Sequence, residues 1–151
     1  MRLYCIHNLN KRANNMTYST ATQTAAIVAN DPKLYTVLDL QTIMAEAKAS
    51  AAIAAQSYLD DWNASTGGNQ YGEPMYCGFA WVNIYGVKGN TKLGRAMKQA
   101  GYTKDYTGAY QIYNPAGYGG QSMDVKEAGA RAAALVFEQY GFKAYMGSRA
   151  D

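Results

Sequence analysis

The chain has 151 residues, of which 48% are hydrophobic and 17% are charged, and its net charge is +3. This composition excludes an intrinsically disordered protein, and the length fits one domain with one core. No apolar run approaches the roughly 20 residues that a membrane-spanning helix needs. We therefore predict a cytoplasmic protein with a single α/β domain over residues 17–151. Residues 1–16 are expected to form a flexible tail, in which Met16 is an alternative start.

The first half of the domain is predicted to be helical. Residues 17–30 favour a short helix that ends before Pro32, because the residue preceding a proline avoids helical dihedral angles. Thr36 and Asp39 have the spacing of a capping box, which predicts an alanine-rich helix over residues 37–62. Its apolar stripe consists of small side chains and suits close packing against a flat partner. Glycine and polar residues predict an exposed loop over residues 63–74.

The second half alternates between strand and helix patterns. Strands are predicted over residues 79–85, 109–114 and 142–147, where β-branched and aromatic residues are common. One helix begins at the capping residue Asn90 and ends at Gly101, and a second begins at Ser122 or Asp124 and ends at Tyr140. The predicted fold is α/β or α+β. An N-terminal helix precedes a β-α-β-α-β unit, and a three- to four-stranded sheet carries helices on one or both faces. Parallel and antiparallel strands both fit this pattern.

The two faces of the predicted sheet differ in character, because side chains alternate along a strand. One face is apolar and suits the helices that follow the strands: Ala80, Val82, Ile84, Tyr110, Ile112, Phe142, Ala144 and Met146. The other face is aromatic and partly polar: Phe79, Trp81, Asn83, Tyr85, Ala109, Gln111, Tyr113, Lys143 and Tyr145. We expect the helix over residues 37–62 to cover the aromatic face. The alternative is an open stacking platform for single-stranded nucleic acid, although the strands lack the aromatic motif of known RNA-binding sheets and the extra strand pair of those sheets is not evident.

A ligand site is predicted at one end of the sheet. If the strands are parallel, ligands bind beyond their carboxyl ends, where the turn after the first strand, the glycine-rich loop Asn114–Ser122 and the chain end meet. Glycines let a ligand approach the backbone, and a helix N-terminus attracts anions. The loop matches neither the lysine-containing phosphate loop nor the dinucleotide fingerprint. The candidate ligand-binding residues are Lys88, Asn90, Gly117, Tyr118, Gly119, Gly120, Gln121, Ser122 and Arg149.

The sequence offers little support for catalysis. One histidine and two cysteines are too few for a structural zinc site, and no cofactor motif is present. Cys77 is expected to be a small buried residue. We expect neither catalytic residues nor a bound metal, and the question of enzymatic activity stays open, with a non-enzymatic role favoured.

Three segments resemble a family of small proteins of unassigned function from tailed bacteriophages. They are CGFAWVNI (Cys77–Ile84), GGQSMDVKEA (Gly119–Ala128) and SRAD (Ser148–Asp151). The resemblance covers about the last half of the chain and carries over no catalytic residues. It implies a phage gene product that acts in the cytoplasm of a bacterial host.

Charge and tyrosine content complete the functional prediction. Residues 77–151 carry a net charge of +4 and residues 37–76 carry −4, and the chain contains 14 tyrosines. Tyrosine favours half-exposed surfaces that stack on ligands or partners. We predict a phage accessory protein that binds an anionic ligand, either a nucleotide or a nucleic acid, through strand-end loops and tyrosines. The alternative is a structural or protein-interaction module that contacts a host protein or forms part of the virion; the oligomeric state is not predicted.

Overall fold

The computed structural model describes residues 31–67 and 72–151, and residues 31–151 form one compact unit. The tail predicted over residues 1–16 and the helix predicted over residues 17–30 lie outside the described residues. The elements, in chain order, are η1 (Pro32–Leu34), α3 (Val37–Thr66), β1 (Gly78–Tyr85), α4 (Lys92–Gln99), β2 (Thr103–Lys104), β3 (Tyr110–Tyr113), α5 (Met123–Gln139) and β4 (Lys143–Ala150).

The sheet has four strands in the order β2-β3-β1-β4, and every neighbouring pair is antiparallel. After α3 the chain therefore follows a β-α-β-β-α-β path, which confirms the predicted α+β class. Two strands differ from the prediction. β2 was missed because two residues are too short to show an alternating pattern. β4 extends to Ala150, past the predicted end at residue 147, so the chain end pairs with β1.

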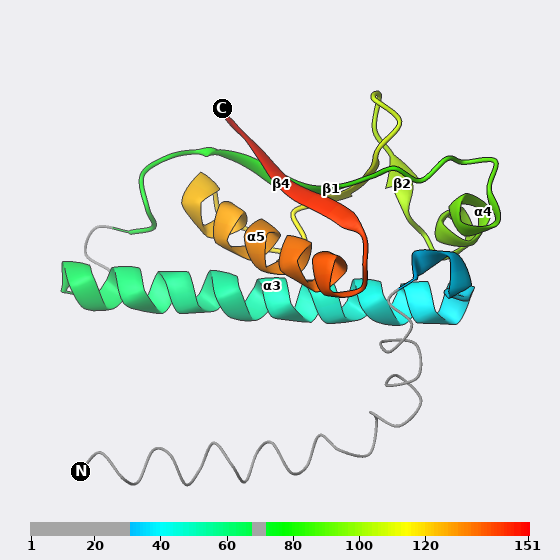
Figure 1. Cartoon of the computed structure of the whole chain (residues 1–151). Helices are drawn as coiled ribbons and strands as arrows, with labels where there is room; N and C mark the ends of the chain where they lie inside the picture. The colour runs from blue at the N-terminus through cyan, green and yellow to red at the C-terminus, as the bar shows by residue number, and fades with distance from the viewer. Residues whose placement is uncertain (1–30, 68–71) are drawn as a thin grey trace, which may run out of the picture. The chain divides into compact units, whose positions relative to one another are not determined.

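Within residues 31–67 and 72–151, the helices that pack on the sheet lie on one of its faces (Figure 1). α5 packs against β1 and β4, and α3 packs against the other side of α5. The expectation that α3 covers the aromatic face is therefore wrong. Its small-residue stripe, which includes Ala47, Ala51 and Ala55, faces another helix instead. A Cβ on Gly129 of α5 would lie 3.2 Å from the Ala51 carbonyl oxygen, so two stripes of small residues allow the helices to approach closely.

The helix ends follow the capping signals closely. Thr36 and Asp39 form the predicted capping box, and α3 continues past residue 62 until Gly67 takes a φ of 77°. Ser122 caps α5 as predicted. α4 differs by one residue, because the Thr91 hydroxyl, and not Asn90, accepts from the Gly94 N–H. In the described part of the chain, no helix is both long enough and apolar enough to cross a membrane.

The apolar face of the sheet forms the core, as predicted. Its buried side chains are Ala80, Val82, Ile84, Tyr110, Ile112, Phe142 and Ala144. An aromatic cluster continues this core toward α3, in which Tyr102 contacts Phe137 and Tyr35 contacts Tyr140 and Phe142. Two of the buried hydroxyls bond to backbone oxygens: Tyr35 donates to Tyr140 at 2.8 Å and Tyr102 donates to Leu40 at 2.7 Å. The Tyr140 hydroxyl donates to the Glu46 carboxylate. Much of the tyrosine content is therefore structural.

Candidate functional site

The glycine-rich loop contacts a carboxylate from its own chain. Both oxygens of Glu73 are involved: they accept from the Gln121 N–H at 2.9 Å, from the Ser122 N–H at 3.2 Å and from the Tyr118 hydroxyl. These hydrogen bonds, with that of Tyr118 the strongest, lower the pKa of Glu73. The N-terminus of α5 thus holds an anion, as its geometry predicts, and that anion is Glu73.

Gly120 leaves room for the contact between Glu73 and Tyr118. A Cβ on Gly120 would lie 2.3 Å from a Glu73 carboxylate oxygen and 2.4 Å from the Tyr118 hydroxyl, both far below van der Waals contact. Asn114, at a φ of 41°, turns the chain out of β3, and its amide donates to the Tyr118 carbonyl at 2.9 Å. The loop is thereby closed by internal bonds, so an external anion would have to displace Glu73. The predicted ligand-binding role of residues 117–122 stays a prediction.

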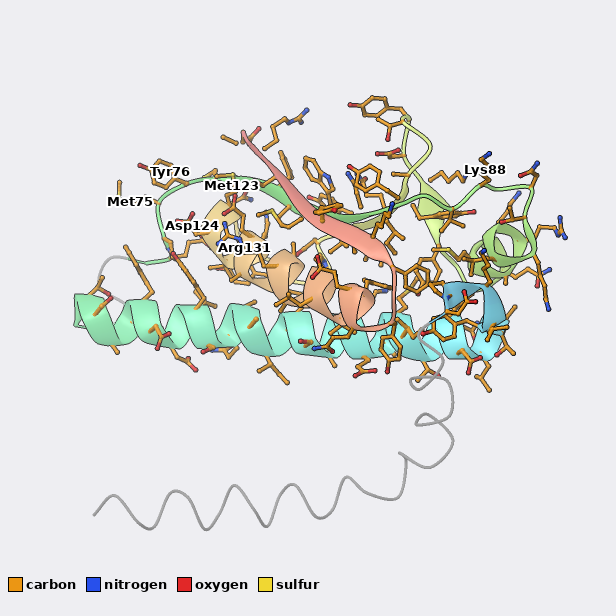
Figure 2. The ribbon with its side chains drawn as sticks, viewed as in Figure 1. Met75, Tyr76, Lys88, Met123, Asp124 and Arg131 are labelled. Atoms are coloured by element: carbon orange, nitrogen blue, oxygen red, sulfur yellow. The ribbon has the colours of Figure 1, made fainter. Side chains whose placement is uncertain are left out.

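The structure brings together two of the three segments that were expected to meet. Gly78 at the start of β1 donates to the Gln121 carbonyl at 3.1 Å, and Arg149 pairs with the neighbouring Phe79. Lys88 and Asn90, by contrast, follow the other end of β1. β1 is antiparallel to both β3 and β4. Its carboxyl end therefore lies at the opposite end of the sheet from the carboxyl ends of β3 and β4. Figure 2 shows Lys88 far from Met123, the first residue of α5.

Among the described residues, no helix covers the face of the sheet opposite α5, and this face is aromatic. Phe79 contacts Tyr113 with ring centres 6.3 Å apart, and Tyr85 contacts Tyr145 at 5.9 Å. Trp81 lies between these pairs along β1 and is opposite both Tyr113 and Gly147. We define the open face by its outward-pointing residues: Phe79, Trp81, Asn83, Tyr85, Gln111, Tyr113, Lys143, Tyr145, Gly147 and Arg149.

A groove of about 710 Å³ occupies one end of the open face. The loop between β2 and β3 rises on this side of the sheet (Figure 1) and forms a wall of the groove, where the side chain of Tyr106 is fully exposed. A Cβ on Gly147 would lie 2.5 Å from the Trp81 indole nitrogen, so the missing side chain leaves room for the indole. The main residues that line the groove are Phe79, Trp81, Tyr106, Gln111, Tyr113 and Arg149.

The charges around the groove are mixed. The Arg149 guanidinium lies 5.8 Å from the centre of the Phe79 ring, and the Lys126 ammonium lies 5.4 Å from the same ring. Lys126 is buried and donates to the Gly78 carbonyl at 2.8 Å. Asp105 also lines the groove, but its carboxylate accepts three hydrogen bonds from Thr107 and Ala109 within its own loop. These bonds, chiefly that of the Thr107 hydroxyl, lower the pKa of Asp105.

Other chemistry finds little support in the described residues. Cys77 is free and exposed, so the expectation of a buried cysteine is wrong; it lies just before β1 in an isolated bridge with Ser122, outside the packed core. Within residues 31–67 and 72–151, no group of three or more His, Cys, Asp or Glu side chains could hold a metal ion. His7 lies outside the described residues.

Three important residues were not predicted from the sequence. Glu73 is 45 residues from Tyr118 along the chain, and no local sequence pattern predicts that contact. Tyr106 lies in the loop after the missed strand β2. Gly147 was predicted to end the last strand, but its pairing with Trp81 was not predicted. Comparison of the chain with protein-family models, curated proteins and solved structures gave no match, so the functional argument rests on this geometry.

Proposed function

We propose that the protein binds single-stranded nucleic acid on the open face, with bases stacked on its aromatic rings. The observation that carries this proposal is the uncovered run of aromatic residues along β1 and its neighbours, which ends in the groove beside Arg149. In the described part of the chain, the helices pack on the other face. Tyr85, Tyr113 and Tyr145 are therefore exposed, and Phe79 and Trp81 are half-buried.

The open face has the groups that such a ligand needs. A base stacked on an aromatic side chain contributes about 1–3 kcal/mol, and every base has a flat face to offer. Between the aromatic pairs, the Gln111 amide donates to Asn83 at 3.1 Å, and these two amides can bond to base edges. Arg149 and Lys143, at opposite ends of the face, can each contact a phosphate.

The length of the face suits a short strand of nucleic acid. β1 has eight residues, and a rise of roughly 3.3 Å per residue gives a path of about 25 Å. Single-strand sites on other β-sheets begin at about four nucleotides. Four-stranded sheets of this kind do present aromatic residues to RNA, but a fold alone does not specify a function, so the side chains carry the argument.

Fluorescence of Trp81 tests the proposal directly. The chain has two tryptophans, and Trp62→Phe leaves Trp81 as the only reporter. Short RNA and DNA oligonucleotides at low salt should quench its emission as a base stacks on the indole. Absence of quenching together with absence of binding in an anisotropy titration would refute the proposal.

Alanine variants then locate the site. Trp81→Ala and Tyr113→Ala should each weaken oligonucleotide binding about tenfold or more, since a lost stacking contact is worth about 1–3 kcal/mol. Tyr58→Ala is the matched control, because Tyr58 is an exposed tyrosine on α3 and lies outside the open face. Equal losses in all three variants would indicate a general effect on folding.

Self-association is the second candidate function. The exposed fractions of Tyr113 and Tyr145 are 55% and 59%, and β4 is an edge strand of eight residues, so two copies could pair through this side. Light scattering at high protein concentration tests this directly. A dimer that dissociates in Tyr145→Ala would support the second candidate, and a persistent monomer would exclude it.

A further inference from the structure

The surface around α4 is positively charged. Residues 86–104 contain five basic residues and no acidic residue. The only ion pair among residues 31–67 and 72–151 joins Arg131 to Glu127, far along the sequence from this segment. We define the α4 basic surface by its exposed cations: Lys88, Lys92, Arg95, Lys98 and Lys104.

This surface is hollowed and lacks acidic groups in its hollows. A cleft of about 560 Å³ between α4 and β2 is lined by Lys98, Lys104 and the Tyr110 ring. A second hollow of about 410 Å³, between α4 and η1, is lined by Lys88, Lys92 and Lys33, among other residues. Lysines that surround a concave surface concentrate positive potential there, which attracts anions and above all polyanions.

The backbone that carries these cations is fixed to the core. The Tyr110 hydroxyl donates to the Gly94 carbonyl at 2.9 Å, which ties α4 to β3. A Cβ on Gly94 would lie 2.2 Å from the Lys88 carbonyl oxygen, so the turn before α4 is packed directly onto the helix. Only the long side chains at the surface have to be ordered when a ligand binds.

The α4 basic surface begins where the open face ends. Tyr85 ends that face opposite Lys143, and the turn that follows contains Lys88. The Lys104 ammonium lies 3.1 Å from the place that a Cβ on Gly89 would occupy, so β2 brings a second cation to the same turn. A strand that passes Tyr145 and Tyr85 thus arrives at positive charge.

We propose that the α4 basic surface binds the phosphates of a nucleic acid strand where it extends past Tyr85. This inference rests on the proposed function and adds a second part to the site. The open face would bind the bases of a short segment, and the α4 basic surface would bind the backbone of the segment next to it. Affinity should then depend on both oligonucleotide length and salt.

Salt dependence provides the measurement, because the logarithm of the binding constant falls with that of salt concentration by about 0.7 per phosphate neutralised on a single strand. For an oligonucleotide of about four nucleotides, near the lower limit of known sites, Arg149 and Lys143 give a slope of about −1.4. For one of about twelve nucleotides, the wild type should show a slope of about −3 or steeper.

The decisive variant is Lys92→Gln with Lys98→Gln, which removes two exposed charges of α4. It should reduce the long-oligonucleotide slope by about 1.4 and leave binding of the short one unchanged. The control, Lys48→Gln with Arg131→Gln, removes the same net charge from α3 and α5 and should alter neither. Circular dichroism melting confirms that each variant is folded.

Two failures can be told apart. If the wild type binds both oligonucleotides with the same slope, or if the α4 variant and the control lose slope equally, this inference is wrong and the proposed function stands. If the wild type binds neither RNA nor DNA of either length, both proposals fail.

Discussion

The buried tyrosines and the tyrosines of the open face differ in what their hydroxyl groups contact. Tyr102 and Tyr110 donate to backbone carbonyls in the core, at 2.7 and 2.9 Å. In the described part of the chain, no protein group bonds to the hydroxyls of Tyr113 and Tyr145, whereas the Tyr85 hydroxyl accepts from the Asn83 amide on the same face. A buried carbonyl that loses its donor destabilises the fold, so both the ring and the hydroxyl of each buried tyrosine stabilise the core. The second group offers its rings to solvent.

One short strand shows how local this division is. Tyr110 and Tyr113 both belong to β3, three residues apart, and therefore point to opposite faces of the sheet. Tyr110 is 3% exposed and Tyr113 is 55% exposed. The same residue type stabilises the fold at one position and is free for a ligand at the other, so tyrosine content alone predicts neither role.

Truncation of one tyrosine from each group should give the largest difference in the free energy of unfolding. Tyr102→Ala removes a ring that contacts Tyr110 and Phe137, and we expect a loss of about 3–5 kcal/mol in the free energy of unfolding. Tyr145→Ala should change it by less than about 0.5 kcal/mol, as is usual at exposed positions. Urea denaturation measures both, and similar values would show that this division is wrong.

Alkaline pH should reveal the contribution of a buried tyrosine to the free energy of unfolding. Burial raises the pKa of Tyr102 well above its ordinary value of 10.0. The stability that follows from this shift is fully present below pH 10 and is lost as pH rises toward the folded-state pKa, because the unfolded phenol ionises first. Above pH 10, the wild type should lose up to about 1.4 kcal/mol per pH unit more than Tyr102→Phe, which cannot ionise. Parallel pH profiles of the two proteins would contradict this.

Removal of the hydroxyl alone should have a smaller effect that still depends on the group. Tyr110→Phe leaves the Gly94 carbonyl without its donor, and we expect a loss of about 1 kcal/mol in unfolding free energy. Tyr113→Phe keeps its ring and should preserve both stability and oligonucleotide binding. If Tyr113→Phe abolished binding, the hydroxyl and not the stacked ring would be the contact.

The fold was largely predictable because its signals are local. The capping box at Thr36, the cap at Ser122 and the alternation in β1 each depend on a few neighbouring residues. The position of α3 was not predictable in the same way. Its small-residue stripe fits a sheet or a helix equally well, and the choice depends on the matching stripe of α5 around Gly129.

The candidate site was predicted only in part, since it depends on strand direction. Alternation along β1 identified the aromatic face correctly, but the convergence of Lys88 with Arg149 required parallel strands. The antiparallel order places these residues at opposite ends of the sheet. The contact of Glu73 with the glycine-rich loop is long-range, and such pairings leave no periodic pattern in a sequence.

Tyr118 is intermediate in burial between the two groups of tyrosines. Its contribution to stability should decrease in acid, unlike that of Tyr102 or Tyr113. It is half-buried, and burial together with Glu73 raises its pKa to about 12. Its hydroxyl donates to the Glu73 carboxylate, which titrates, whereas the carbonyl partners of Tyr102 and Tyr110 do not. Glu73→Gln should therefore lower the unfolding free energy at pH 7 by about 0.5 kcal/mol, a small value because Glu73 is well solvated.

The pH dependence of this loss identifies its origin. The folded-state pKa of Glu73 lies below its ordinary value of 4.5, so the carboxylate stabilises the fold above pH 4.5 and loses that effect as pH falls through the lowered pKa. Urea denaturation of the wild type and of Glu73→Gln should converge in acid, and the control Glu138→Gln, which removes an exposed carboxylate from α5, should follow the wild type throughout. If the difference persisted in acid, packing around Gly120, and not the charge of Glu73, would hold the glycine-rich loop on α5.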